Sequence, residues 1–170
     1  MRNALITLLG IPVFALTLIV QSSIVSRMPL LHGTADLVLL VLAAWSLQEN
    51  VTTSWQWALI AGLLVSFVSG LPSFTPLIGY FVINTFARIL RKQIWQTPIL
   101  AMFATTVFGT LTMHVMTFAI LQVTGVSLPV FQSLNLITLP SALLNLILAV
   151  PIYAAMKDFA SWLYPVNIEI

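Results

Sequence analysis

Residues 20–42 read VQSSIVSRMPLLHGTADLVLLVL, and this stretch decides the fold class. A polar Gln-Ser-Ser ends one long apolar run, and a break containing Arg27 and Pro29 follows. Asp36 stands directly before the next apolar run. These apolar runs exceed the roughly 4 to 8 residues of a buried strand and do not alternate as barrel strands do. The pattern therefore predicts membrane-spanning helices on both sides of the break.

The composition of the whole chain agrees with that pattern. Hydrophobic residues make up 60% of the 170 positions and charged residues only 6%, whereas a soluble domain carries about a quarter charged residues. Each span needs roughly 20 residues and a short connection. The chain is predicted to be an all-α integral membrane protein, one domain over residues 1–170 with six transmembrane helices, at residues 4–26, 34–48, 54–71, 74–90, 98–122 and 134–163.

The first two helices need separate arguments. The apolar run after Arg2 is longer than the core of a signal peptide and no small-x-small cleavage site follows, so we expect a retained first helix. The second has few strongly apolar residues and carries Asp36, which costs up to about 3 kcal/mol at the centre of a span. We expect Asp36 to lie at the helix end, where the cost is lower, and the second helix to insert as a hairpin with the first.

Basic residues predict the orientation. With six spans and an internal N-terminus, Arg27 alone is external, and the cytoplasmic side holds the other five basic residues, Arg2, Arg88, Arg91, Lys92 and Lys157. This is the direction of the positive-inside rule, so both termini are predicted to be cytoplasmic. The tryptophans fall near predicted span ends, where indoles prefer the interface; they are Trp45, Trp55, Trp57, Trp95 and Trp162.

Small and polar residues at helical spacing mark faces that meet another helix. Gly62, Ser66 and Gly70 form two small-xxx-small steps, which serve either internal packing or contact with a partner helix. His114 shares a face with three threonines and is either a proton relay or ligand contact, or a hydrogen-bond partner of a neighbouring helix. Asn84 is expected to pack internally.

The last helix and the acid of the second helix leave two further alternatives. Ser141 and Asn145 lie on one stripe that faces either inward or a second protein, because an amide in lipid must find a partner. Asp36 is either a functional intramembrane acid or an N-cap that interacts favourably with the helix dipole.

Enzymatic chemistry finds no support in the residues. The chain has no cysteine, its four acids form no evident acid/base pair, and its two histidines lack metal-ligand spacing. Gly-rich phosphate loops and the common hydrolase motifs are missing as well. We therefore expect no catalytic residue, metal or cofactor, and no nucleic-acid partner. Binding remains, either of a small molecule in a polar-lined cavity or of the helices of other membrane proteins.

Four segments resemble the MreD family, the multi-span proteins that determine rod shape in bacteria. That family has a Gln-Ser pair at the end of its first helix, a Pro-Asp at the start of its second, and a Gly-Leu-x-x-Asp-x-x-Ser-Gly in its third. The matching residues are Gln21, Ser22 and Asp36; Gly62, Leu63, Ser69 and Gly70; the basic RILRKQ at residues 88–93; and Pro140, Ser141, Asn145 and Pro151 of the closing helix.

The resemblance covers nearly the whole chain, with two departures. Ala35 stands where the family usually has Pro, and Ser66 stands where it usually has Asp. Any role of that second acid is therefore not carried over. The substitution leaves a smoother packing face along Gly62, Ser66 and Gly70, which favours a helix contact.

The resemblance implies a non-enzymatic component of the cell-elongation machinery in the bacterial inner membrane. MreD-like proteins associate with MreC, a single-span protein with a large extracytoplasmic domain, and through it with the MreB filament, the glycosyltransferase RodA and a penicillin-binding transpeptidase. We expect the MreC span to pack on the small face of the third helix. The basic cluster of Arg88, Arg91 and Lys92 then meets either anionic lipid of the bilayer or a filament surface. A homodimer stays possible.

An alternative function belongs to another class. MreD is similar in size and helix layout to the S-components of energy-coupling-factor vitamin transporters, which bind a substrate and dock on a separate ATPase module. The first helix lacks the Ala-xxx-Ala docking pattern of such subunits, since Ala4 and Ala15 are not at that spacing. A polar pocket near His114 or Asn145 is what this alternative requires.

Overall fold

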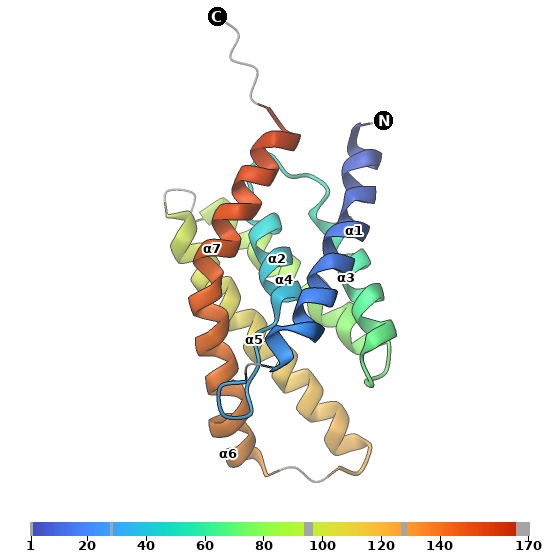
Figure 1. Ribbon diagram of the computed structural model, residues 1–170, viewed down its shortest axis with the longest axis vertical. Coiled ribbons are helices and arrows are strands. Elements are labelled where there is room, and N and C mark those ends of the chain that lie inside the picture. Colours follow the sequence, from blue (N-terminus) through green and yellow to red (C-terminus); the bar gives the residue numbers. More distant parts are fainter. Residues whose placement is uncertain (1, 28, 94–96, 127–128, 166–170) are drawn as a thin grey trace, which may run out of the picture.

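A computed structural model describes residues 2–27, 29–93, 97–126 and 129–165 (Figure 1). In this part of the chain the regular elements are all helical, which confirms the predicted all-α class. The long helices are α1 (Arg2–Ser23), α2 (Leu37–Ser46), α3 (Ser54–Val68), α4 (Phe74–Gln93), α5 (Pro98–Val123) and α7 (Leu139–Leu163). Three short elements are η1 (Val25–Arg27), α6 (Val130–Ser133) and the π-helical η2 (Leu134–Thr138).

Three helical stretches in the described part are long and apolar enough to cross a membrane, namely Asn3–Arg27, Pro98–Val123 and Val130–Leu163. The apolar helices α2 and α3 have 10 and 15 residues, about 15 Å and 22 Å of rise, against a hydrocarbon core of about 30 Å. α4 has the length but carries Asn84, Arg88 and Arg91. Length and composition thus support three of the six predicted spans.

The short α2 is the centre of the molecule. It contacts α1, α3, α4, α5 and α7, and Figure 1 shows it between α1 and α7. Every residue from Val38 to Ser46 is buried. Leu, Val and Ala dominate all sides of this helix, and a helix that is hydrophobic all round is one that is buried. The prediction of residues 34–48 was too long, because Asp36 caps the helix in an extended conformation.

Other helix ends also differ from the predicted ones. α3 ends at Val68 rather than at residue 71, and α4 continues to Gln93 rather than ending at residue 90. The last helix begins at Val130, four residues earlier than predicted, and runs through η2 into α7.

The prolines within this run do not break it. Pro140 has no N–H for the carbonyl of Leu136, and that carbonyl instead accepts the His32 N–H at 3.1 Å.

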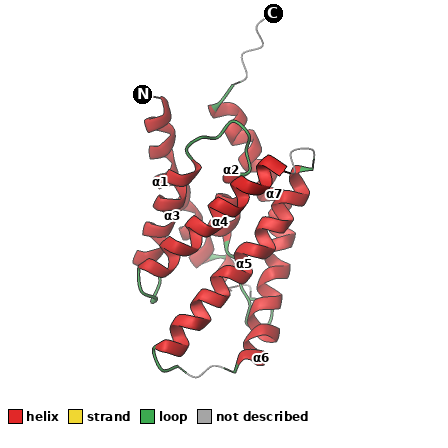
Figure 2. Ribbon diagram, turned by 180° about the vertical axis from the view of Figure 1, so that it is seen from behind, coloured by secondary structure: helices red, strands yellow, loops and turns green. Residues whose placement is uncertain are grey.

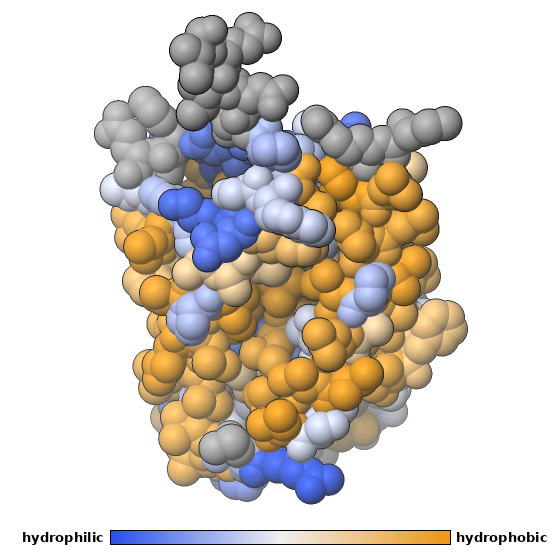
Figure 3. All heavy atoms as spheres, turned by 45° about the horizontal axis from the view of Figure 1, so that its top comes forward, coloured by the Kyte–Doolittle hydropathy of each residue, from blue (hydrophilic) through white to orange (hydrophobic). Residues whose placement is uncertain are grey.

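The ends of the helices lie at two opposite ends of the molecule. The N-terminal end of α1, the C-terminal ends of α4 and α7, the connection α2–α3 and the first turn of α5 lie toward the top of Figure 1. The connection α3–α4, the last turn of α5 and α6 lie lower, toward the other end. Figure 3 shows an apolar flank between polar groups at the two ends, and Figure 2 shows α4 and α5 side by side, with Phe86 stacked on Phe108 at 3.9 Å.

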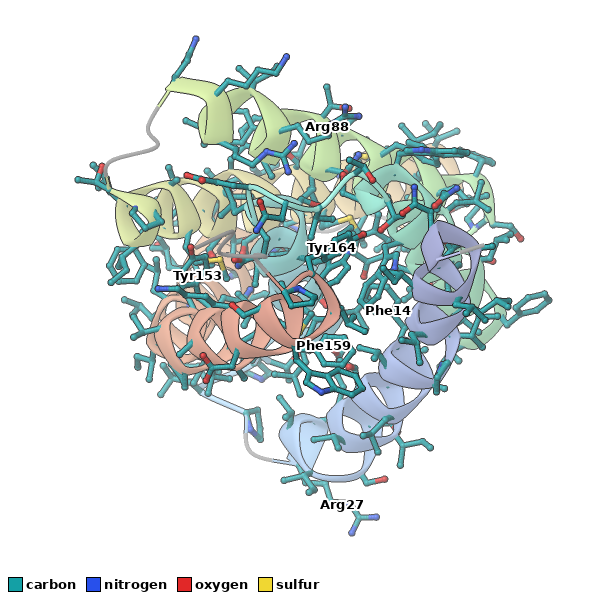
Figure 4. All side chains as sticks on the ribbon, turned by 90° about the horizontal axis from the view of Figure 1, so that it is seen from above. Phe14, Arg27, Arg88, Tyr153, Phe159 and Tyr164 are labelled. Atoms are coloured by element: carbon teal, nitrogen blue, oxygen red, sulfur yellow. The ribbon has the colours of Figure 1, made fainter. Side chains whose placement is uncertain are left out.

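Two of the predicted interfacial tryptophans are core residues instead. Trp45 and Trp57 have no exposed surface, and their rings stack at 4.1 Å. Phe14 meets Trp57 edge-on at 5.6 Å, and in Figure 4 Phe14 and Phe159 point from α1 and α7 toward the middle. The interfacial prediction is therefore wrong for Trp45 and Trp57. Trp55 and Trp162 are exposed, as an interfacial position requires, and Trp95 lies outside the described residues.

Candidate functional site

Polar side chains from several helices meet at the beginning of α2. The first N–H groups of a helix have no partner within it. Here Asp36 Oδ1 accepts the Leu39 N–H at 3.0 Å, and Gln21 Oε1 of α1 accepts the Val38 N–H at 3.2 Å. The second carboxylate oxygen of Asp36 accepts a long hydrogen bond, 3.5 Å, from the hydroxyl of Tyr80 in α4. Asp36 is thus an N-cap, the structural one of its two predicted roles.

The polar stripe of α7 holds the other side of this site. Asn145 Oδ1 accepts the backbone N–H of Asp36 at 2.7 Å, while its Nδ2 donates to Thr110 Oγ1 in α5 at 2.8 Å. One turn earlier, Ser141 Oγ accepts the Thr34 N–H at 3.1 Å. Ser141 and Asn145 are both buried. In this structure the stripe faces inward rather than a second protein.

The connection between α1 and α2 packs tightly against η2 and α7. Leu30 and Gly33 pair through their backbones in a turn in which Leu31 adopts φ 56°. A Cβ atom on Gly33 would lie 2.6 Å from the Ser141 nitrogen and 2.7 Å from the Ile137 oxygen. Only a residue without a side chain fits there. The connection is therefore fixed to the last helix of the chain.

Asp36 stands at the helix end, as predicted, and that end lies within the bundle. α2 has 10 residues, a rise of about 15 Å, and its first turn lies near mid-height in Figure 1. The connection before α2 has an extended backbone at Asp36. Its N–H groups at Thr34 and Asp36 are satisfied by the side chains of Ser141 and Asn145.

Two other predicted polar residues are also bonded within the bundle. Asn84 Oδ1 accepts a hydrogen bond from Ser46 Oγ of α2 at 3.0 Å, and both residues are buried. His114 Nδ1 lies 2.9 Å from Thr138 Oγ1 of η2, beside an apolar groove of about 350 Å³ lined by Thr117, Phe118 and other residues. The interhelical hydrogen bond predicted as one role of His114 is therefore present.

The small residues of α3 do not form one continuous face. Gly62 is buried against α4, where a Cβ atom would lie 2.9 Å from the Cα of Leu77. Ser66 donates to the carbonyl of Leu63 in its own helix at 2.7 Å. Gly70 lies beyond the end of α3 and has no atom near its Cβ position. Gly62 serves internal packing, so this face is not available as a whole to a partner span.

The basic residues of α4 have different surroundings. Arg91 is half-buried and its Nη1 donates to the carbonyls of Gln48 and Val51 at 2.6 and 3.0 Å, which fixes the connection from α2 to α3. Arg88 and Lys92 are exposed at the same end. Arg88 and Lys92 are thus exposed along the helix, whereas part of the Arg91 side chain is used inside the bundle.

Sequence reasoning missed two members of the site, Tyr80 and Thr110. Both stand on stripes that the spacing did reveal, since Tyr80 precedes Asn84 by four residues and Thr110 precedes His114 by four. What the spacing lacked was the tertiary arrangement, which gives Tyr80 a partner in Asp36 before α2 and Thr110 a partner in Asn145 of α7. Not every buried hydroxyl has one: Thr105 and Thr106, one turn before Thr110, make no side-chain hydrogen bond.

The side chains at the start of α2 hydrogen-bond backbone groups and one another. Among the described residues, no group of three or more His, Asp or Glu lies close enough to hold a metal ion. The one carboxylate of the site accepts bonds from a backbone N–H and a phenol. Comparison of the chain with protein-family models, curated proteins and solved structures found no significant match.

Proposed function

We propose that the chain is a non-enzymatic membrane scaffold of the bacterial elongation complex, as its resemblance to MreD implies. The observation that carries this proposal is that the predicted polar residues have hydrogen-bond partners within the chain. Gln21, Asp36, Asn84, His114 and Asn145 each hydrogen-bond another part of the chain. A substrate-binding subunit needs such groups to face its ligand, whereas a scaffold needs them to hold helices in place.

The proposal includes the orientation and the membrane. The six long helices would cross or enter the bacterial inner membrane with both termini in the cytoplasm. Its support is that the N-terminal end of α1 and the C-terminal end of α7 lie at the same end of the bundle (Figure 1). The last turns of α4, with Arg91 and Lys92, also lie there, in the sense of the positive-inside rule.

The partner would be the single span of MreC, and through it MreB, RodA and the transpeptidase. Since Gly62 is covered by α4, such a span would pack on an exposed flank. An apolar groove of about 530 Å³ runs along α4, lined by residues that include Ile78, Val82 and Phe108. Van der Waals packing drives helix association in lipid, so a shallow apolar groove of this kind suits the purpose.

The test is mass spectrometry of proteins that co-purify with the chain from native membranes in mild detergent. Recovery of MreC, RodA and the transpeptidase is expected. Val82→Trp, which fills the groove, should lower the recovery of MreC several-fold, while Ile147→Trp, on the exposed face of α7, should not.

Two results would overturn the proposal. Recovery of a coupling protein with paired ATPases, or of a bound vitamin, would establish the S-component alternative. Recovery of the wild-type chain without any elongation protein, under conditions in which the partners stay together, would remove the scaffold function.

A further inference from the structure

A polar cavity of about 290 Å³ lies at the end of the bundle that holds the N-terminal end of α1 and the C-terminal end of α7. Four segments line it: the connection after α2, the last turns of α4, the first turn of α5 and the last turns of α7. Its charged lining residues are Arg91, Lys157 and Glu49. None of the hydrogen bonds described above for the start of α2 reaches this cavity, so it is a separate site.

The cations of the cavity keep donors for a ligand. Arg91 uses one nitrogen, Nη1, for the carbonyls of Gln48 and Val51, and a guanidinium has further N–H donors on Nε and Nη2. Lys157 is exposed on α7 and brings three more. With Glu49 counted, two positive charges and one negative charge leave a net charge of +1. This matches a phosphodiester, which carries a single negative charge.

The surface below the cavity is apolar and follows one face of α7. Leu143, Ile147 and Val150 are 55%, 69% and 43% exposed, and with Ala154 they lie at helical spacing beneath Lys157 and Ser161 at the cavity mouth. Figure 4 shows Tyr153, which also lines the cavity, on the side of α7 toward α4 and α5. A charged pocket thus continues directly into an apolar strip.

We propose that this cavity binds the phosphodiester headgroup of an anionic phospholipid, whose acyl chains lie along the exposed strip of α7. Arg91 and Lys157 hold the phosphate, and Glu49 limits the site to headgroups with no second negative charge. Free inorganic phosphate also offers anionic oxygens to the two cations but has no group for the strip. The apolar strip is the reason to assign the site to a lipid.

Native mass spectrometry of the purified full chain with added phosphatidylglycerol tests the proposal. Lys157→Gln should weaken binding about fivefold, because the phosphate loses one of its two charged partners. Glu49→Gln, which removes the opposing charge, should strengthen binding by a similar factor. Lys92→Gln is the matched control, because Lys92 is an exposed lysine at the same end that does not line the cavity, and it should leave binding unchanged. Arg91 is left intact because it also holds the connection after α2.

A second set of measurements tests the apolar strip and the source of the phosphate. Ile147→Asn should weaken phosphatidylglycerol binding, and inorganic phosphate at equal concentration should not displace the lipid. Equal losses in Lys157→Gln and Lys92→Gln would mean unspecific attraction to anionic lipid and would overturn the site. Displacement by inorganic phosphate, with Ile147→Asn unchanged, would make the cavity a phosphate site and would overturn the lipid.

Discussion

Asn145 uses both ends of its side chain to join parts of the chain that are far apart in sequence. Its carbonyl oxygen accepts the Asp36 N–H, 109 residues away, and its NH₂ group donates to Thr110. A buried group that loses its partner keeps the whole desolvation cost, about 1–3 kcal/mol. The stability of the site at the start of α2 therefore depends on this one amide.

Replacing Asn145 by Leu should reduce the free energy of unfolding by about 1–3 kcal/mol, because the Asp36 N–H loses its acceptor. The Thr110 hydroxyl loses a donor but still bonds the Thr106 carbonyl. The measurement is a denaturant titration of the purified protein in detergent micelles. Thr85→Val is the control: Thr85 is exposed and bonds only the Phe81 carbonyl of its own helix, so its effect should stay below about 0.5 kcal/mol. Equal effects of the two substitutions would contradict the role given to Asn145.

At this scale the sequence predicts which residues are unusual and not which residues they meet. Asp36 and Asn145 stand out as polar groups in apolar runs, yet nothing in their spacing pairs two positions 109 residues apart. For Trp45, the sequence predicts the wrong surroundings. An indole near a span end is usually interfacial, but five helices surround α2, so Trp45 stacks on Trp57 in the core.

Among the long helices, α2 has the largest share of buried residues. Leu40 in its middle has no exposed surface, whereas Leu143 of α7 is 55% exposed. Shortening a buried leucine leaves a cavity that the neighbouring helices fill only in part, at a cost of about 2–5 kcal/mol. The same change on the outer face of a membrane bundle exchanges one apolar contact for lipid.

We therefore expect Leu40→Ala to lower the free energy of unfolding by about 2–5 kcal/mol, and Leu143→Ala to change it by less than about 0.5 kcal/mol. Both values come from the same denaturant titration, with helix content followed by circular dichroism. A small loss for Leu40→Ala, or a larger one for Leu143→Ala, would show that α2 is not the packed centre of the bundle in solution.

The existence of the six long helices could be predicted, but the exact residues at which they begin and end could not. The apolar runs and their breaks are local signals, and they placed each helix within a few residues. The ends of α2 depend on a cap and on contacts from α7, and η2 depends on a carbonyl that Pro140 leaves free for His32. These are tertiary contacts, so periodicity alone could not reveal them.

The whole molecule has two distinct ends. Lys92 in the last turn of α4 and Ser161 in the last turn of α7 lie at the end that holds the first turn of α1. Arg27 and Thr124 follow the ends of α1 and α5 that point the other way (Figure 1). The chain has no cysteine, so a single introduced cysteine reports its own side of the membrane. All four positions are exposed.

Single substitutions to cysteine at these four positions should divide into two pairs. A membrane-impermeant maleimide applied to intact cells, after the outer barrier has been opened, should label Arg27→Cys and Thr124→Cys. Lys92→Cys and Ser161→Cys should react only after the inner membrane is broken. The reverse pattern would invert the proposed orientation, and labelling within either pair at different stages would mean that the helices between them do not cross as proposed.

The hydrogen bond between Asp36 and Asn145 also affects the order in which the chain can fold during its synthesis. A ribosome adds about 5–20 residues per second, so the 109 residues between the two partners take roughly 5 to 20 seconds to make. During that interval α2 has been synthesised, yet the residues that hold its beginning do not exist. Insertion of the first third of the chain must therefore be completed late, by its last helix, and a truncated product that lacks α7 should be cleared by membrane proteases.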